Sequence, residues 1–113
     1  MSEITDLLDI LNDIRRTQKH THRLTKIYPD LKTRISASKE DALQEYQQNP
    51  TEASLEKARI LKEMVDTVAT DRTSIISEMA YYQDPDVSAM TPDEQEIYKK
   101  IIALLQEFKM VTL

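Results

Sequence analysis

The feature that most constrains the fold is a long stripe of residues, all but one of them apolar, between Pro50 and Gln83. Its members recur at alternating three- and four-residue steps: Ala58, Leu61, Val65, Val68, Arg72, Ile75, Met79 and Tyr82. Such heptad-like spacing places them on one side of a helix. At about 1.5 Å per residue, a helix over 50–83 is roughly 50 Å long. The stripe therefore predicts a central helix, and it is broad enough to pack against two neighbours.

The chain contains no glycine among its 113 residues. Glycine is the usual residue of tight hairpin turns and phosphate-binding loops. Its absence argues against a β-rich fold and excludes the glycine fingerprints of P-loop and dinucleotide-binding proteins. A core must be built mainly from Leu, Ile, Val, Met and Ala, because the chain has no Trp and one Phe. We predict an all-α fold: an antiparallel bundle of three to four helices around the long central helix, with dimerisation as a way to complete it.

Prolines and the residues beside them predict where the helices begin. Residues 49–52 (Asn-Pro-Thr-Glu) combine a capping Asn with a proline at the first helical position and a Glu suited to a capping box. Residues 91–94 (Thr-Pro-Asp-Glu) repeat this pattern. We predict one helical domain over 1–113, with a loop at 84–91 and a break near 36–38 as an alternative to one continuous second helix. The predicted helices cover about 2–28, 30–48, 50–83 and 92–109.

The reactive side chains do not indicate an enzyme. The chain has no cysteine, which excludes disulfides, thiolate catalysis and Cys-ligated zinc. His20 and His22, the only histidines, would project about 200° apart on a helix and cannot share a metal. No nucleophile–base arrangement has a recognisable signature. We therefore predict no catalytic activity, no cofactor and no metal site.

The apolar runs do not indicate a membrane protein. None approaches the length of a membrane span. The first residues are acidic and amphipathic, which is not the pattern of a secretion signal. We expect a cytoplasmic protein that makes no membrane contact.

Charge is unevenly distributed along the chain. The segment 15–34 carries +6, which leaves −11 for the rest of a chain whose net charge is −5. Its basic residues are Arg15, Arg16, Lys19, Arg23, Lys26, Lys32 and Arg34. Three interpretations follow: a solvated face that pairs with acidic helices of the same chain or of a dimer, a docking surface for an acidic protein, or a contact with nucleic-acid phosphates. The overall acidity and the scarcity of interleaved aromatic residues weaken the third.

Together these features predict a non-catalytic intracellular module for protein–protein interaction: an adaptor, chaperone, inhibitor or assembly subunit. It would bind a protein partner, associate with itself as a dimer, or do both. Candidate contact residues lie in the basic segment and at the end of the long helix, where an exposed tyrosine suits a contact site. They are Arg15, Arg16, Lys19, Arg23, Lys26, Tyr81 and Tyr82. The alternative function is a nucleic-acid-associated regulator that uses the basic segment 15–34.

Arg72 is the one charged residue on the stripe of the long helix. In one interpretation the stripe drifts, because 3.6 residues per turn does not match a strict heptad, and Arg72 lies at its edge with its head group in water. In the other, Arg72 belongs to a buried polar layer with Gln18 or Thr21, which interrupt the apolar stripe of the first helix. Such a layer can fix register or oligomeric state.

Overall fold

A computed structural model describes residues 3–112, which form four helices joined by short irregular segments. The helices are α1 (Glu3–Thr21), α2 (Asp30–Gln48), α3 (Glu52–Tyr82) and α4 (Pro92–Thr112). The 31-residue α3 contacts each of the other three. This confirms the predicted all-α bundle around a long central helix. No helix within residues 3–112 has the length and apolar character needed to cross a membrane.

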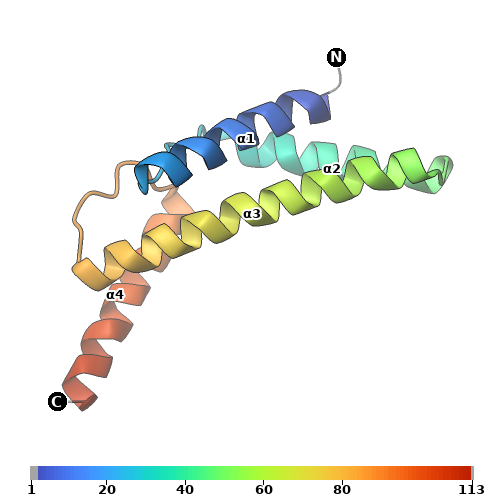
Figure 1. Cartoon of the computed structure of the whole chain (residues 1–113). Coiled ribbons are helices and arrows are strands. Elements are labelled where there is room, and N and C mark those ends of the chain that lie inside the picture. The colour runs from blue at the N-terminus through green and yellow to red at the C-terminus, as the bar shows by residue number, and fades with distance from the viewer. Residues whose placement is uncertain (1–2, 113) are drawn as a thin grey trace.

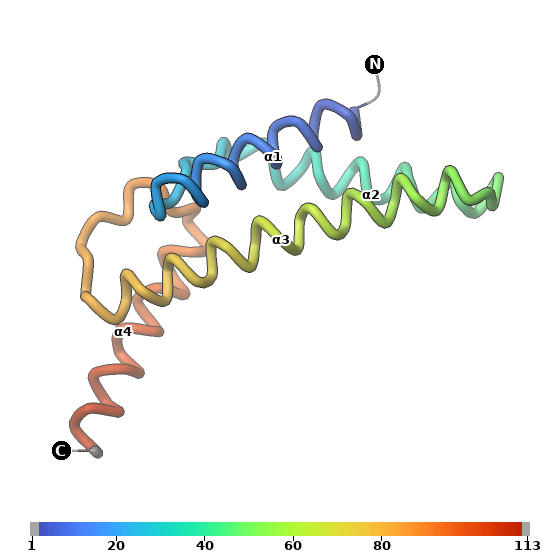
Figure 2. The backbone as a smooth tube through the Cα atoms, in the orientation of Figure 1, coloured from blue at the N-terminus to red at the C-terminus, as the bar shows by residue number. Residues whose placement is uncertain are grey.

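The helices form an elongated bundle. The first three lie side by side, with α1 and α3 running in the same direction and α2 running against both (Figure 1). By contrast, α4 crosses the last part of α3 obliquely, and its C-terminal part projects beyond the other helices (Figure 2). The radius of gyration, 17.3 Å, exceeds the roughly 13 Å of a compact domain of about this length. The last helix thus presents much of its surface away from the first three.

The larger apolar core lies between α1, α2 and the first part of α3. Its buried members are Leu7, Leu11, Ile14, Leu31, Leu61 and Val68. Leu7 and Leu61 are 0% exposed. On α2 the residues buried towards the bundle include the small side chains of Ser38 and Ala42, which take up little volume at a helix contact. The second helix runs without a break through 36–38.

A second, smaller apolar cluster joins the end of α3 to α4. It consists of Ile76, Ala80, Met90 and Tyr98. The Tyr98 hydroxyl donates to the backbone, lying 2.6 Å from Asp84 O and 3.0 Å from Met79 O. Burial, and to a smaller extent the charge of Asp84, raises the pKa of Tyr98, so the hydroxyl stays protonated as a donor. This residue ties α4 both to α3 and to the loop between them.

The buried residues of α3 change their spacing halfway along the helix. In order they are Ser54, Leu61, Val68, Arg72, Ile76 and Ala80. The first steps span seven residues, whereas every step after Val68 spans four. Since a residue turns the helix by about 100°, each four-residue step moves the buried line about 40° around it. Tyr82 therefore leaves the core and is 71% exposed, and its predicted place on the core stripe is wrong.

The first helix ends at Thr21, so the predicted helix over 2–28 is wrong for 22–28; its predicted first residue lies outside the described residues. His22 adopts a left-handed backbone conformation with φ 55°. The chain then folds back, and the Thr25 N–H donates to Gln18 Oε1 at 3.3 Å. Continued as a helix, these two residues would lie about 10 Å apart along the axis, so this contact requires the helix to stop.

The third helix begins two residues later than predicted, at Glu52. Thr51 is its N-cap and forms a capping box with Ser54: each backbone N–H donates to the other side-chain hydroxyl, at 3.2 Å and 3.1 Å. The predicted box with Asn49 as the cap and Glu52 as its partner is wrong. Ser54 also donates its hydroxyl to Asn49 O at 2.9 Å, so the short residue at position 54 secures both the turn and the helix start.

The start of α4 agrees with the predicted capping sequence. The Glu94 N–H donates to Thr91 Oγ1 at 3.2 Å, and the Thr91 N–H donates to Glu94 Oε1 at 2.9 Å. Both bonds satisfy N–H groups that a helix start leaves unpaired. The helix continues to Thr112, beyond the predicted end at 109.

Candidate functional site

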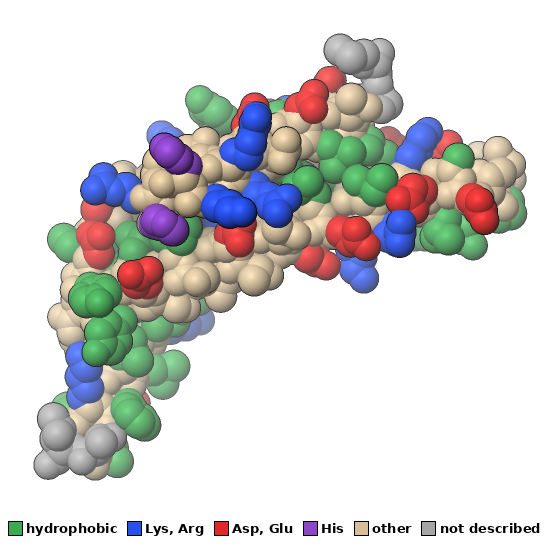
Figure 3. Space-filling model, viewed as in Figure 1, with side chains coloured by type: hydrophobic (Ala, Val, Ile, Leu, Met, Phe, Trp, Pro, Cys, Tyr) green, Lys and Arg blue, Asp and Glu red, His purple; other side chains and the backbone are tan. Residues whose placement is uncertain are grey.

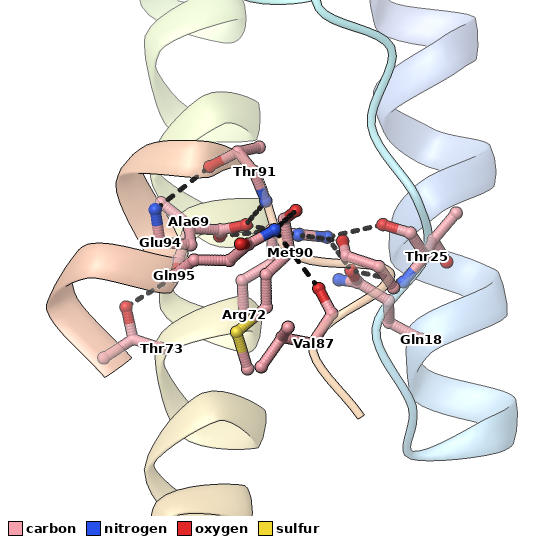
Figure 4. A network of polar contacts seen from close by, with 11 residues as sticks. Gln18, Thr25, Ala69, Arg72, Thr73, Val87, Met90, Thr91, Glu94 and Gln95 are labelled. Atoms are coloured by element: carbon pink, nitrogen blue, oxygen red, sulfur yellow. Dashed lines mark hydrogen bonds and ion pairs between the residues drawn. The ribbon is translucent and has the colours of Figure 1, made fainter. Parts of the chain in front are cut away.

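A buried polar layer lies where the end of α1, the middle of α3 and the start of α4 meet (Figure 4). Arg72 is 4% exposed and Gln18 is 1% exposed. Each stands four residues after a buried apolar residue of its helix, Val68 on α3 and Ile14 on α1. The layer therefore closes the larger apolar core at one end.

Arg72 uses all three nitrogens of its guanidinium group as donors. Nε and Nη2 bind the two carboxylate oxygens of Glu94 at 2.7 Å and 2.6 Å, a bidentate pair of the strong, charge-assisted kind. Nη1 donates to Gln18 Oε1 at 2.9 Å and to Thr25 O at 2.7 Å. Nη2 also reaches Ala89 O at 3.1 Å. One side chain thus connects α1, α4 and the two loops that precede α2 and α4.

Glu94 is charged in this layer. Burial is the largest single influence on its pKa and opposes ionisation. Hydrogen bonds from Arg72 and Thr91, together with the charge of Arg72, outweigh burial and hold the pKa of Glu94 below its ordinary value. The carboxylate thus serves as the capping side chain of α4 and as the counterion of Arg72.

Of the residues predicted for this layer, the structure brings together Arg72 and Gln18 but not Thr21. Thr21 is exposed, and its hydroxyl donates to Thr17 O at 2.8 Å and accepts from the Arg23 N–H at 3.2 Å. Sequence reasoning missed Glu94, the main partner of Arg72. A signal was present, because Glu94 occupies the third helical position of α4, where its carboxylate turns back towards the helix start.

The basic residues of the segment 15–34 are partly neutralised within the chain. Three of them form ion pairs with acids: Arg16 with Asp13, Lys32 with Asp93 at 3.4 Å, and Arg34 with Glu3 at 2.7 Å. Figure 3 shows Lys and Arg side chains interspersed with Asp and Glu on the face in view. The segment therefore does not present an unbroken basic surface on that face.

The remaining predicted contact residues of the segment are exposed. Arg23 lies close enough to Asp86 to help lower the pKa of that carboxyl, although hydrogen bonds from Ser88 have the larger effect. Arg15, Lys19 and Lys26 form no ion pair with any other described residue. These three cations remain open to an external partner.

The two tyrosines at the end of α3 both face outward. Tyr81 is 63% exposed and Tyr82 is 71% exposed. Their rings meet edge to face with centroids 5.1 Å apart. Lys109 Nζ lies 5.8 Å from the centroid of the Tyr81 ring, within cation–π range. The end of α3 thus presents an aromatic surface beside the last part of α4.

A second exposed apolar surface runs along α4, and we name it the α4 stripe. It consists of residues at alternating four- and three-residue steps: Ile97, Ile101, Leu104, Phe108 and Val111. Ile101 is half-buried at its border. The other members are 54%, 64%, 67% and 82% exposed, in chain order. The sequence does not mark this face of α4 as a binding surface, because apolar spacing alone does not distinguish a core face from a binding face.

The α4 stripe lies beside the face of α4 that packs on α3. That packed face includes the buried Tyr98 and the partly buried Ile102 and Leu105. Figure 3 shows hydrophobic side chains over the region where the end of α3 meets α4. The apolar surface of α4 is thus wider than one neighbouring helix can cover.

The described residues offer no metal site: none of their His, Asp and Glu side chains gather in a group of three that could hold an ion. His20 and His22 are both exposed. No protein-family model matches the chain, and comparison with curated proteins and with solved structures finds no match.

Proposed function

We propose that the chain is a non-catalytic, cytoplasmic module for protein–protein interaction, and that it binds an apolar helix of a partner protein along the α4 stripe. The observation that carries this proposal is the row of exposed residues at four- and three-residue steps on one helix. Helices that dock against other helices use anchors at this spacing. Soluble monomers seldom expose so continuous an apolar surface without a function for it.

The polar layer supports this role by fixing the start of α4. Arg72 and Glu94 hold the first turn against α3, and Tyr98 adds a second attachment one turn later. The C-terminal part of α4 projects beyond the other helices (Figure 1). A binding helix held in place loses less conformational freedom when its partner docks, which favours affinity.

Exposed cations give the module a second contact. Arg15, Lys19 and Lys26 can attract an acidic segment of the partner, and Tyr81 and Tyr82 offer aromatic anchors of the kind enriched at interfaces. The alternative of a nucleic-acid-associated regulator gains no support, because acids stand among the basic residues on the face in view (Figure 3). Steep salt dependence of binding would be its signature.

Site-specific photo-cross-linking in the cells of origin tests the proposal. A photoreactive amino acid replaces Leu104 in the full chain, and a control chain carries it at Gln106, which lies about 200° away on the same helix. We expect a discrete protein adduct from position 104, little from position 106, and loss of the adduct when Phe108→Glu is added. No adduct from position 104, or equal adducts from both positions, would contradict the proposal.

A further inference from the structure

We infer that the occupant of the α4 stripe is a second copy of this chain, whose α4 pairs with the first in the antiparallel direction. This inference rests on the proposed function of the stripe as a binding surface. It goes further by identifying the partner and its orientation. The argument for a second copy comes from the charges beside the stripe.

Only one flank of the α4 stripe is open and charged. Lys100 and Glu107 are exposed and lie seven residues apart, directly before Ile101 and Phe108, so both lie on the same side of the stripe. The opposite flank holds Tyr98 and Leu105, which belong to the cluster packed against α3. At these two positions a partner helix meets one cation and one anion, spaced two turns apart; the neighbouring acids Asp93 and Glu96 are paired within the chain with Lys32 and Lys99.

Antiparallel pairing makes this flank complementary to itself. When the second helix runs in reverse, Lys100 of each copy lies opposite Glu107 of the other, giving two ion pairs. The apolar layers then match Ile97 with Phe108 of the second copy, and Ile101 with Leu104. In parallel pairing, Lys100 would instead face the flank that holds Leu105, and neither ion pair would form.

The shape of the molecule leaves room for this arrangement. The C-terminal part of α4 projects beyond the other three helices (Figures 1 and 2). Antiparallel pairing would set the two copies of α1–α3 at opposite ends of the helix pair. The contact uses the same surface on both copies, so it closes as a two-fold dimer and does not extend into a filament.

Sedimentation equilibrium of the full chain tests the dimer. We expect the parent protein to be a dimer and Leu104→Glu to be a monomer, because a charge in the centre of the apolar layers opposes pairing. Gln106→Glu is the matched control: it adds a charge two positions away on the opposite face and should leave the dimer unchanged. A monomeric parent protein, or equal effects of both substitutions, would overturn the inference.

Charge exchange tests the antiparallel register. Lys100→Glu and Glu107→Lys should each weaken the dimer roughly tenfold, since each turns two attractive contacts into repulsive ones. The double variant should recover parental affinity, and a mixture of the two single variants should form a heterodimer in preference to either homodimer. Lys99→Glu, on an exposed position outside the flank, is the control. A double variant as weak as the single variants would contradict the register.

The two proposals can fail separately. If the parent chain is monomeric and the cross-linker at position 104 captures a different protein, the inference of a second copy is wrong. The proposed binding function of the stripe is then retained. If the chain dimerises and Leu104→Glu leaves the dimer intact, the stripe is not the dimer contact. The mass of the cross-linked adduct distinguishes these cases directly, because a self-adduct has twice the mass of the chain.

Discussion

The two halves of α3 differ in how completely the apolar side chains around them are buried. The first half packs between α1 and α2, and its exposed large apolar residues, Leu55 and Ile60, are five positions apart, about 140° around the helix. In the second half, Ile76 and Ala80 pack in the cluster that contains Tyr98 of α4, and there Tyr82 and most of the α4 stripe remain exposed. Two neighbouring helices cover most of the apolar surface of a long helix. A single neighbouring helix leaves part of the apolar surface exposed, where a partner can bind.

The polar layer marks the boundary between these regions. Up to Val68 the buried residues keep to one side of the helix, and from Val68 through Arg72 to Ala80 they move progressively around it. Buried charge pairs add little net stability compared with apolar packing, but they specify which elements meet. In this chain the layer holds the first turn of α4 against α3, and so sets where the apolar surface of α4 points.

The largest expected effect compares two leucines, one on each side of that boundary. Leu61→Ala should destabilise the fold by about 3–5 kcal/mol, because Leu61 is 0% exposed in the larger core and its removal leaves a cavity. Leu104→Ala should cost less than about 1 kcal/mol of monomer stability, because little buried area is lost. Denaturant unfolding followed by circular dichroism measures both at a concentration where the chain is monomeric, and equal losses would contradict the comparison.

Arg72→Leu should have the next largest effect, about 2–4 kcal/mol, since it leaves Glu94 and Gln18 without their main partner. The damage should be local: α4 loosens, α1 to α3 stay folded, and the dimer weakens because the α4 stripe loses its fixed direction. Sedimentation together with helix content distinguishes this result. An unchanged association state in a folded variant would show that the layer does not control α4.

Acid should weaken the same attachment. The pKa of Glu94 lies below its ordinary value of 4.5 in the folded protein, so its contribution to stability is complete above that pH and disappears as the pH falls through the lowered value. We expect α4 to loosen below about pH 4.5 before α1 to α3 unfold. Glu94→Gln should remove this pH dependence. Simultaneous loss of all helices in the parent chain would argue against a separate attachment.

The smallest expected effect concerns the backbone at the end of α3. Gln83 caps this helix in the left-handed conformation, with φ 55°, which costs most residues about 1 kcal/mol and glycine almost nothing. Gln83→Gly should therefore stabilise the chain by a few tenths to about 1 kcal/mol. Gln48→Gly, inside the last turn of α2, is the control and should destabilise. Thermal unfolding of both variants measures the difference.

Local sequence signals were sufficient for some features of the fold. Position 92 combines a proline with a Thr cap before it, and these determine the start of α4 without help from the rest of the chain. Arg72 could be singled out because it is the one charged side chain on a long apolar stripe. In both cases the informative residues are neighbours along one helix or one turn.

Features that depend on contacts between distant segments were not predictable in this way. Neither glycine nor proline marks the end of α1; His22 turns the chain there because Thr25 bonds Gln18 and Arg72. The pairing of Glu94 with Arg72 was not predicted, because helix capping alone accounts for a Glu at this position. The exposure of Tyr82 and of the α4 stripe depends on how many helices cover the end of α3. Heptad spacing in the sequence does not predict that number.

Amide hydrogen exchange measured by mass spectrometry tests the central claim most directly. The claim is that α1 to α3 bury their own apolar core, whereas the α4 stripe is buried only when a partner binds. The parent chain and Leu104→Glu are compared at a concentration where the parent sediments as a dimer. We predict slower exchange of residues 97–111 in the parent than in the variant, with equal exchange of α1, α2 and the first half of α3. Equal exchange of 97–111 in the two proteins, or a loss of protection spread over all four helices, would contradict the account.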